Sequence, residues 1–415
     1  MKHKPNIEIT APVGTWESLQ AAIQAGADSV YFGIGVLNMR ARSSINFSRR
    51  DLVKISRICR KHGLRTYLTL NTVIFDNELK EMKKMVDSAL KNGIDAIIAS
   101  DHAVIQYARS VGMEVHMSTQ TNITNLEAVK YWSQFSGTMV TARELSLNQV
   151  AAIHRSIIRR KIIGPSGELV KLEVFAHGAL CMAVSGKCYL SLDHYNASAN
   201  RGACYQTCRR PYKVTDSDGE IELLVDNEYI MSPKDLCTIG FLDKIINAGV
   251  SLLKIEGRGR SPEYVKTVVS CYREAVDAVL DGTYSEEKVE GWINRLKTVY
   301  NRGFWEGYYL GRKTGEWAGQ HGSVATTTKE YVGKVTNYFK KLKVAEIKME
   351  SGRLSKGDRI YIQGPTTGVV EFTVPGIRVD LNEVKTTVKG EFCSVPIDIM
   401  LRRADKVYKI NVTGD

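Results

Sequence analysis

The chain has 415 residues, of which 43% are hydrophobic and 25% are charged. This composition is typical of a folded globular protein and excludes collagen-like and disordered classes. The length exceeds that of one ordinary domain, so we expect a barrel-sized domain followed by a smaller one.

The formal net charge of +12 favours anionic partners such as RNA or acidic metabolites. A basic surface also occurs on proteins that bind no nucleic acid, so charge alone does not identify the partner. No segment approaches the roughly 18 apolar residues of a membrane span, and the opening segment MKHKPNIEIT lacks the apolar stretch of a signal peptide. We therefore expect a cytoplasmic protein with no membrane partner.

The first 258 residues repeat a short β-branched or aromatic run followed by an amphipathic helical stretch. The pattern predicts strands at residues 7–12, 29–34, 65–71, 96–101, 114–119, 138–143, 172–178 and 252–258. No G-x-G-x-x-G follows the first strand, and eight such units favour a TIM-like (β/α)8 barrel over an open doubly wound sheet. The fold class is therefore α/β.

A cysteine-rich insertion at about residues 179–235 separates the seventh and eighth strands. Loops after barrel strands form the catalytic face, so we expect the insertion beside the barrel mouth. Helical segments are expected at 262–296, followed by a glycine-rich link at 315–322. Short alternating strands then predict a small basic β-barrel, a candidate RNA-binding domain. The predicted domains are residues 1–325 and 330–415.

Eight cysteines without a signal peptide argue against a disulfide framework. Four of them fall within the insertion: Cys181, Cys188, Cys204 and Cys208. Paired C-x-x-C knuckles of the zinc-ribbon kind are absent, so the spacing favours an iron–sulfur cluster over a structural zinc. We expect Cys237 to be helical and structural, and the remaining cysteines to be small buried packing residues.

Polar residues at the predicted strand ends converge on one opening. The candidate substrate-binding residues are Arg40, Arg42, Asn71, Gln120, Asn122, Arg143 and Arg258. His177 and Glu256 are the catalytic candidates, His177 as a proton donor or hydrogen-bond partner of the cluster sulfurs. Glu256 acts chemically or orients Arg258 or a water. A lone histidine is more often structural, and a single arginine more often forms an ordinary salt bridge.

Basic residues around the insertion alternate with Tyr205 and Tyr212, which predicts phosphate contacts beside a base-stacking face. The alternative is a solvated basic loop that shields the thiols. The candidate RNA-binding residues are Arg201, Arg209, Arg210, Lys213 and Arg260. No Ser-His-Asp, Cys-His or H-E-x-x-H pattern stands out, which argues against a hydrolase.

The segment EVFAHGALCMAVSGKCYLS, residues 173–191, closely resembles the signature of the collagenase-like peptidase U32 family. The segments NRGACYQTCRRPY, SPKDL, LLKIEGRGRSPEYV and PVGTWESLQAAIQAGADSVYFG extend the resemblance over nearly the whole chain. Members of this family are understood mainly as RNA hydroxylases and as oxygen-independent ubiquinone hydroxylation proteins that carry a 4Fe–4S cluster. Its two RNA branches convert a wobble uridine of tRNA to 5-hydroxyuridine, or hydroxylate a cytidine of 23S rRNA.

The resemblance implies that the four thiols of the insertion hold a 4Fe–4S cluster and that prephenate is the hydroxyl donor. Prephenate is a small dicarboxylate, and Arg143 and Arg258 are the strand-end arginines suited to its carboxylates. By length and by its single appended barrel, the chain is most similar to the tRNA branch. The alternatives are a U32-type peptidase, the rRNA hydroxylase, and an iron–sulfur subunit of ubiquinone hydroxylation. An electron donor or a second copy of the chain is a further candidate partner.

Overall fold

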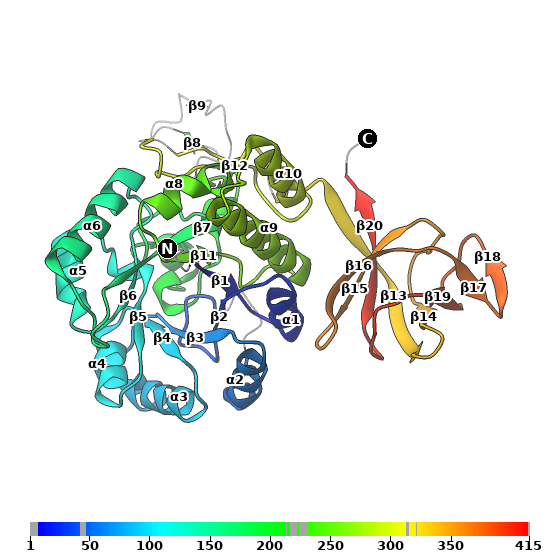
Figure 1. The fold of residues 1–415 in the computed structure, drawn as a ribbon, viewed down its shortest axis with the longest axis horizontal. Helices are drawn as coiled ribbons and strands as arrows, with labels where there is room; N and C mark the ends of the chain where they lie inside the picture. Colours follow the sequence, from blue (N-terminus) through cyan, green and yellow to red (C-terminus); the bar gives the residue numbers. More distant parts are fainter. Residues whose placement is uncertain are drawn as a thin grey trace.

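The computed structural model describes residues 7–41, 47–212, 214–215, 222–223, 231–312, 315–320 and 322–413. Within them, eight parallel strands form a closed barrel, since β11 pairs with both β1 and β7 (Figure 1). The strands are β1 Glu8–Pro12, β2 Ser29–Phe32, β3 Arg65–Leu70, β4 Ala96–Ala99, β5 Val115–Met117, β6 Thr138–Val140, β7 Lys171–Gly178 and β11 Leu252–Ile255. The TIM-like barrel predicted from the eight repeats is confirmed.

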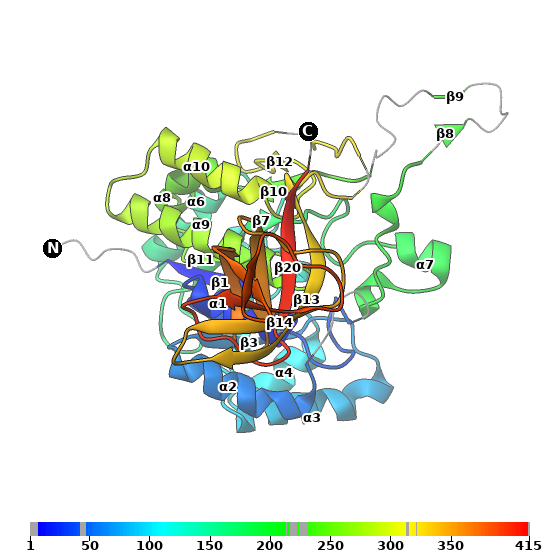
Figure 2. The same ribbon diagram turned by 90° about the vertical axis from the view of Figure 1, so that its right-hand side faces the viewer.

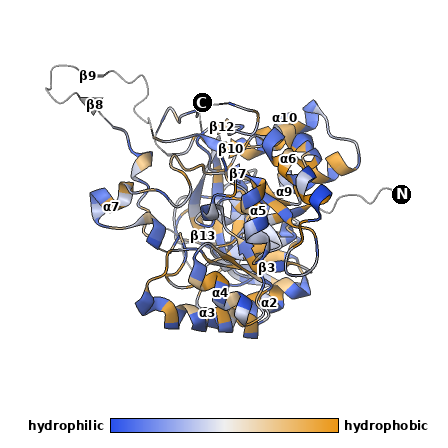
Figure 3. Cartoon of the chain, turned by 90° about the vertical axis from the view of Figure 1, so that its left-hand side faces the viewer, coloured by the Kyte–Doolittle hydropathy of each residue, from blue (hydrophilic) through white to orange (hydrophobic). Residues whose placement is uncertain are grey.

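Helices surround the barrel and bury their apolar faces against the strands. They are α1 Trp16–Gln24, α2 Leu52–Lys61, α3 Leu79–Lys91, α4 His102–Ser110, α5 Leu126–Ser133, α6 Leu147–Arg160, α8 Leu242–Asn247 and α9 Pro262–Leu280. Figure 3 shows hydrophobic and hydrophilic bands alternating along them, as expected for helices that face a core on one side. Side chains of Thr15, Asp101 and Asn125 cap the first turns of α1, α4 and α5. No helix among the described residues has both the length and the apolar composition needed to cross a bilayer.

The insertion after β7 contains the short helix α7 Leu190–Tyr195, which projects from the barrel (Figure 2). The strands β8 Val214–Thr215 and β9 Glu222–Leu223 pair with each other. The chain returns through β10 Asp235–Cys237, which lies antiparallel to β7 and parallel to β12 Phe304–Trp305. Cys237 therefore lies in a strand, and the expectation that it is helical is wrong. Its register partner is His177, so pairing with β7 overrides the local helical pattern.

Short 3-10 turns at Arg49–Asp51, Asp76–Glu78, Thr119–Thr121, Ala199–Arg201, Thr207–Arg209 and Ile239–Phe241 connect these elements. After α9, the helix α10 Glu286–Lys297 packs against α9. Trp292 on α10 is buried, and its indole nitrogen donates to Glu274 on α9 at 2.9 Å. The helical segment predicted for residues 262–296 is thus divided into α9 and α10.

The carboxy-terminal domain is one antiparallel sheet in the order β16-β15-β20-β13-β14-β19-β17-β18. Its strands are β13 Thr327–Phe339, β14 Val344–Met349, β15 Arg359–Gly364, β16 Gly368–Thr373, β17 Ile377–Val379, β18 Asn382–Val384, β19 Phe392–Pro396 and β20 Lys406–Val412. Residues alternate between the two faces along each strand, and those on one face form a separate core, among them Ile347, Ile360 and Val395. The predicted all-β carboxy-terminal domain is confirmed as an antiparallel sheet, and among the described residues no pairing between its edge strands β16 and β18 closes it into the predicted barrel.

Polar contacts dock this domain on the outer helices of the barrel. Gln24 on α1 donates to the carbonyl of Thr367 at 2.8 Å and accepts from the amide of Val369 at 3.0 Å. Glu263 on α9 forms an ion pair with Lys329 at 2.9 Å. The domain therefore has a defined position beside α1 and α9, as Figure 1 shows.

Candidate active site at the barrel mouth

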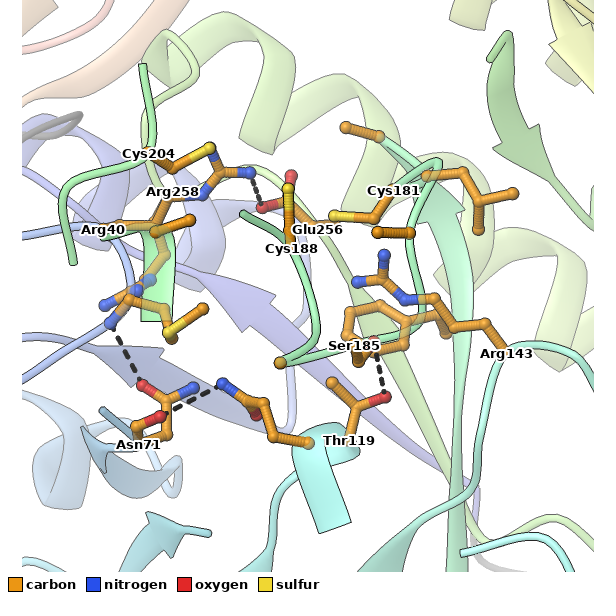
Figure 4. A pocket seen from close by; sticks show the side chains of 18 of the residues that line it. Arg40, Asn71, Thr119, Arg143, Cys181, Ser185, Cys188, Cys204, Glu256 and Arg258 are labelled. Atoms are coloured by element: carbon orange, nitrogen blue, oxygen red, sulfur yellow. Dashed lines mark hydrogen bonds and ion pairs between the residues drawn. The ribbon is translucent and has the colours of Figure 1, made fainter. Parts of the chain in front are cut away.

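A cavity of about 250 Å³ lies at the carboxyl ends of the barrel strands, where the cysteine insertion covers the opening. Its lining comes from the ends of the barrel strands, the loops that follow them and the insertion (Figure 4). Among the predicted substrate-binding residues, the lining includes Arg40, Asn71, Gln120, Arg143 and Arg258. Convergence of strand ends from around a barrel is the usual way in which this fold builds a site.

All four cysteines of the insertion line this cavity. Cys181 follows β7, Cys188 precedes α7, and Cys204 and Cys208 flank the start of a 3-10 turn. Each is a free thiol, with Cys181 exposed and the other three half-buried. Burial raises the pKa of the Cys208 thiol; Arg209 opposes the rise, and the other three thiols add to it. Within the described residues, no three His, Cys, Asp or Glu side chains are grouped closely enough to hold one metal ion.

Arg209 fastens two cysteine segments to each other. Its guanidinium donates to the carbonyl of Leu180 at 2.5 Å and to that of Pro233 at 2.7 Å. Leu180 immediately precedes Cys181, and Arg209 immediately follows Cys208. The half-buried guanidinium of Arg209 thus donates to the protein and holds the insertion together, and its predicted RNA contact stays a prediction.

Arg201 fastens the insertion to the loop after β3. Both of its terminal nitrogens donate to the carboxylate of Glu78 at 2.6 Å, and one also donates to the carbonyl of Val73 at 2.6 Å. The guanidinium also lies 3.9 Å from the ring centroid of Phe75. These groups give Arg201 a structural role in the insertion, and its predicted RNA contact stays a prediction.

The loop after β5 supports the cysteine segment through amide side chains. Gln120 donates to the carbonyl of Asn71 at 3.1 Å and accepts from the hydroxyl of Ser118. Asn122 donates to the carbonyl of Ser185 at 3.3 Å, and it does not line the cavity. Asn71 accepts from the amide of Met39 at 3.2 Å. These predicted substrate-binding residues thus hold the rim of the site, and Asn122 lies behind it.

The cavity is strongly cationic. Among the described lining residues there is one carboxylate, Glu256, and seven cationic side chains: Arg40, Arg143, Arg209, Lys254, Arg258, Arg260 and Arg302. Three of these cations are ion-paired with Glu256, Glu173 and Asp235, and the positive charge of the other four favours an anionic ligand in this partly enclosed site. Arg260 lies 3.5 Å from the ring centroid of Tyr300, so it lines the cavity with its guanidinium stacked.

Arg143 is the cation best placed to receive a ligand. Its guanidinium lies 4.0 Å from the ring centroid of Phe175, and its buried Nε has no hydrogen-bond partner. Figure 4 shows the guanidinium pointing into the cavity on the side of Cys181. A buried donor without a partner is costly unless a ligand completes it.

Glu256 pairs with Arg40 at 2.8 Å, and not with Arg258 as we considered from the sequence. Burial opposes ionisation of Glu256, but Arg40, Arg260 and Arg143 outweigh it and hold its pKa below the usual value. Arg258 instead donates to Thr69 at 2.8 Å and to Asn38 at 3.1 Å. Burial lowers the pKa of Arg258 to about 10, so its guanidinium is still charged at neutral pH.

The floor of the cavity contains an ion pair that sequence reasoning missed. Lys254 on β11 donates to Glu173 on β7 at 3.0 Å, and both side chains are almost fully buried. The second carboxylate oxygen of Glu173 has no partner. The ammonium of Lys254 also lies 4.7 Å from the ring centroid of Tyr31. The available signal was a charged residue in the middle of each of the apolar runs LEVFA and LLKIE.

His177 does not reach the cavity, contrary to its predicted catalytic role. It is 1% exposed, and its Nδ1 lies 3.5 Å from the hydroxyl of Tyr272 on α9. The register of β7 against β11 shifts by one residue between Lys254 and Ile255, which turns the His177 side chain to the helix side of the sheet. Burial lowers the pKa of His177 to about 3, so it is neutral at physiological pH.

The remaining predicted residues are divided between the surface and the unplaced parts of the chain. Arg210 is exposed and lies 5.7 Å from the ring centroid of Tyr195, at the outer side of the insertion. Arg42 and Lys213 lie outside the described residues. Arg210 and Arg260 therefore keep positions from which they can contact an RNA.

The family model for peptidase family U32 matches residues 14–319, which include the barrel strands from β2 onward and the whole cysteine insertion. The chain belongs to peptidase family U32. A collagenase of Porphyromonas gingivalis is 55% identical over 98% of this chain and 98% of its own length.

Other U32 relatives are named for RNA modification. A tRNA hydroxylation protein of Bacillus subtilis is 30% identical over 86% of this chain and 83% of its own length. A 23S rRNA 5-hydroxycytidine synthase of Escherichia coli is 34% identical over 66% of this chain and 40% of its own length. The family therefore contains enzymes named for two different kinds of chemistry.

Proposed function

We propose that this U32 protein is an oxygen-independent RNA hydroxylase that carries a 4Fe–4S cluster and converts a wobble uridine of tRNA to 5-hydroxyuridine. The observation that carries the proposal is one cavity lined by four free thiols and seven cationic side chains. The likeness to the tRNA hydroxylation protein of Bacillus subtilis supports an RNA substrate, because it extends over most of both chains.

The donor set fits a cluster by its chemistry. Four thiolates are the usual ligands of a 4Fe–4S cluster, and all four cysteines here face one cavity without forming disulfides. Glu256 is the main cause of the raised pKa of Arg40, and the nearby Cys181 and Cys204 add to it, so the site contains a cation beside two of the thiols. When bound, the cluster would supply electron transfer next to the substrate.

The cationic lining suits a small dicarboxylate, for which we propose prephenate as hydroxyl donor. Arg143 offers a stacked guanidinium with an unpartnered Nε, the geometry that binds a carboxylate well. Arg258 and Arg260 supply further positive charge in the same cavity. A volume of about 250 Å³ is close to the lower end for small-ligand pockets, which favours a small donor over a large one.

In the balanced reaction, the base exchanges a C5–H bond for a C5–OH bond, and the donor exchanges a C–OH bond for a C–H bond. The base loses the two electrons that the donor gains. Glu256 is ionised and lines the cavity, so it is the group placed to accept the C5 proton and return a proton to the donor carbon. Arg40 keeps Glu256 in the ionised state and in one position through their ion pair at 2.8 Å.

A peptidase is the second candidate, because a relative named collagenase is 55% identical over nearly the whole chain. Peptide hydrolysis by a side-chain nucleophile needs a neighbouring base. No histidine occurs among the described residues that line the cavity, so none of the four thiols there has a neighbouring imidazole to activate it as a nucleophile. The side chains of this mouth therefore favour the hydroxylase.

Nucleoside mass spectrometry of tRNA and rRNA from a deletion strain tests the proposal. The strain is complemented with the wild-type gene, with Cys181→Ala, or with Cys393→Ala, whose cysteine lies buried in the carboxy-terminal core. We expect 5-hydroxyuridine to vanish from tRNA in the deletion strain and with Cys181→Ala. Wild type and Cys393→Ala should restore it.

Unchanged levels of every hydroxylated base in the deletion strain would overturn the RNA hydroxylase. Loss of 5-hydroxycytidine from rRNA alone would move the substrate to the ribosome. Unchanged RNA together with loss of ubiquinone would point to the quinone pathway, and unchanged RNA with collagen or casein cleavage by the purified protein would establish the peptidase. Iron analysis of anaerobically purified protein, expected to fall on Cys181→Ala, tests the cluster separately.

A further inference from the structure

An open groove on the outer face of the carboxy-terminal sheet has no part in the reaction proposed above. It has a volume of about 740 Å³ and lies on β13, β14, β19 and the loop that follows β19. The residues that characterise it are Lys334, Lys340, Lys348, Phe392, Arg402 and Arg403. One carboxylate, Glu346, also lines the groove, and it accepts from the hydroxyl of Thr336 at 2.6 Å.

Three of these side chains form a row across the sheet. Lys334 on β13 is the register partner of Lys348 on β14, and Lys348 is the register partner of Phe392 on β19. Directly opposed like charges destabilise a sheet, so two paired lysines are not explained by folding. Glu350 pairs with Lys334 at 2.7 Å, whereas no ion pair is recorded between Lys348 and any described residue. The ammonium of Lys348 lies 5.7 Å from the ring centroid of the half-exposed Phe392.

The two arginines at the side of the groove sit on a turn that the sheet holds in place. Ala404 has a φ of 71°, a left-handed conformation that a non-glycine residue adopts only when its surroundings impose it. Its amide donates to the carbonyl of Val335 at 2.8 Å, and the amide of Arg402 donates to the buried Asp405 at 2.8 Å. Arg402 and Arg403 are both exposed at this turn. The backbone of the turn is therefore set before any ligand binds, and both arginine side chains extend from it at the side of the groove.

We propose that this groove binds the sugar–phosphate backbone of single-stranded or looped RNA, with Phe392 stacking on one base. Cations in fixed positions around an exposed aromatic ring are the features that recognise phosphates and an unpaired base together. An acidic protein segment would use the charges but leave the ring without a stacking partner. The inference rests on the proposed function only for the choice of RNA as the substrate. The contacts of the carboxy-terminal domain with α1 and α9 would hold an RNA bound in the groove at one place relative to the barrel mouth.

The test compares full-length variants for binding of a fluorescein-labelled 12-nucleotide single-stranded RNA, by fluorescence anisotropy across a salt titration. Arg402→Ala/Arg403→Ala should weaken binding about 10-fold and reduce the salt slope by about 1.4, as expected for two lost phosphate contacts to a single strand. Phe392→Ala should weaken binding about 10-fold without changing the salt slope. The control Lys356→Ala/Lys385→Ala removes the same charge from exposed positions outside the groove and should change neither by more than 2-fold.

Equal weakening by the control and by the arginine pair would overturn the groove and leave only a diffuse charge effect. Unchanged RNA binding in all variants would also overturn it, as would polyglutamate competing as well as bulk tRNA. The two proposals can fail separately. If the deletion strain loses no hydroxylated base while the groove variants still lose RNA binding, the hydroxylase proposal fails and the groove proposal stands. If hydroxylation requires the protein while the groove variants bind RNA normally, the groove proposal fails and the hydroxylase proposal stands.

Discussion

The barrel wall and the cysteine insertion of the same domain are held together by different forces. Wall residues such as Val30, Leu68 and Ile97 are fully buried between the strands and the helix layer. The insertion has little regular structure between residues 179 and 212 and exposes large side chains such as Tyr189. Its position depends on the guanidinium contacts of Arg201 and Arg209. Stability thus resides mainly in the wall, and the proposed chemistry resides mainly in the polar contacts at its mouth.

The largest expected effect comes from the wall, at the buried pair of Lys254 and Glu173. Lys254→Met leaves the almost fully buried carboxylate of Glu173, one of whose oxygens already lacks a partner, without its ion-pair partner. We expect the free energy of unfolding to fall by about 3–5 kcal/mol, measured by urea unfolding at pH 7. The double variant Lys254→Met/Glu173→Leu should recover most of the loss because no buried charge remains. Equal losses in the single and double variants would show that packing, and not the charge, is responsible.

Much of the wall was predictable because each strand combines a short apolar run with a following helical pattern. The eight predicted strands all occur, and closure follows from their number and order. The interior side chains were harder to assign, because which face a residue takes depends on register. A one-residue shift opposite Ile255 turns His177 away from the mouth, and no local pattern in HGALC signals it.

The insertion was predictable in its composition but not in its contacts. The four cysteines could be selected from spacing, and they do line one cavity. The structural roles of Arg201 and Arg209 could not be predicted. Glu78, the partner of Arg201, lies far away in the chain, and Pro233, the partner of Arg209, lies on the other side of the insertion. From the sequence alone, a basic residue beside a cysteine is equally consistent with a contact to an RNA phosphate and with a hydrogen bond to a backbone carbonyl, and only the fold shows which acceptor lies nearby.

The second effect tests whether the insertion depends on one guanidinium. Arg209→Ala leaves the carbonyls of Leu180 and Pro233 without their donor, which costs about 1–3 kcal/mol for each buried group. We expect this loss to loosen the insertion locally, so limited proteolysis should cut within residues 179–212 while thermal unfolding of the barrel changes little. Arg210→Ala, at the exposed neighbouring position, is the matched control and should be cut like wild type. Loss of barrel stability without local cutting would contradict the division between the two regions.

The third effect concerns the corrected role of His177. The folded protein keeps this imidazole neutral down to about pH 3, whereas the unfolded chain protonates it near pH 6.5. Its folded pKa is depressed, so its contribution to stability is complete above pH 6.5 and is lost progressively as the pH falls toward 3. Between pH 6.5 and 5, urea unfolding should show wild type losing up to about 1.4 kcal/mol per pH unit more than His177→Gln. Identical pH dependence in the two proteins would contradict a buried, neutral histidine.

The smallest effect on stability is expected at Glu78, where the insertion meets the wall. The Arg201 hydrogen bonds lower the pKa of Glu78 from its ordinary value of 4.5. A depressed folded pKa gives stability that is present above pH 4.5 and lost as the pH falls through the folded value. Because the pair is partly exposed, Glu78→Gln should cost less than about 1 kcal/mol at pH 7 in urea unfolding.

The difference between wild type and Glu78→Gln should therefore shrink between pH 5 and pH 3, and a difference that stays constant over this range would rule out the ion pair as its source. Arg201→Lys provides the matched comparison, since it keeps the charge but loses the two-pronged contact and the stacking on Phe75. If the wall and the insertion are divided as argued, both variants unfold almost like wild type. Both should nevertheless expose the insertion to proteolysis, because the contact between Arg201 and Glu78 positions the insertion and adds little to the stability of the barrel.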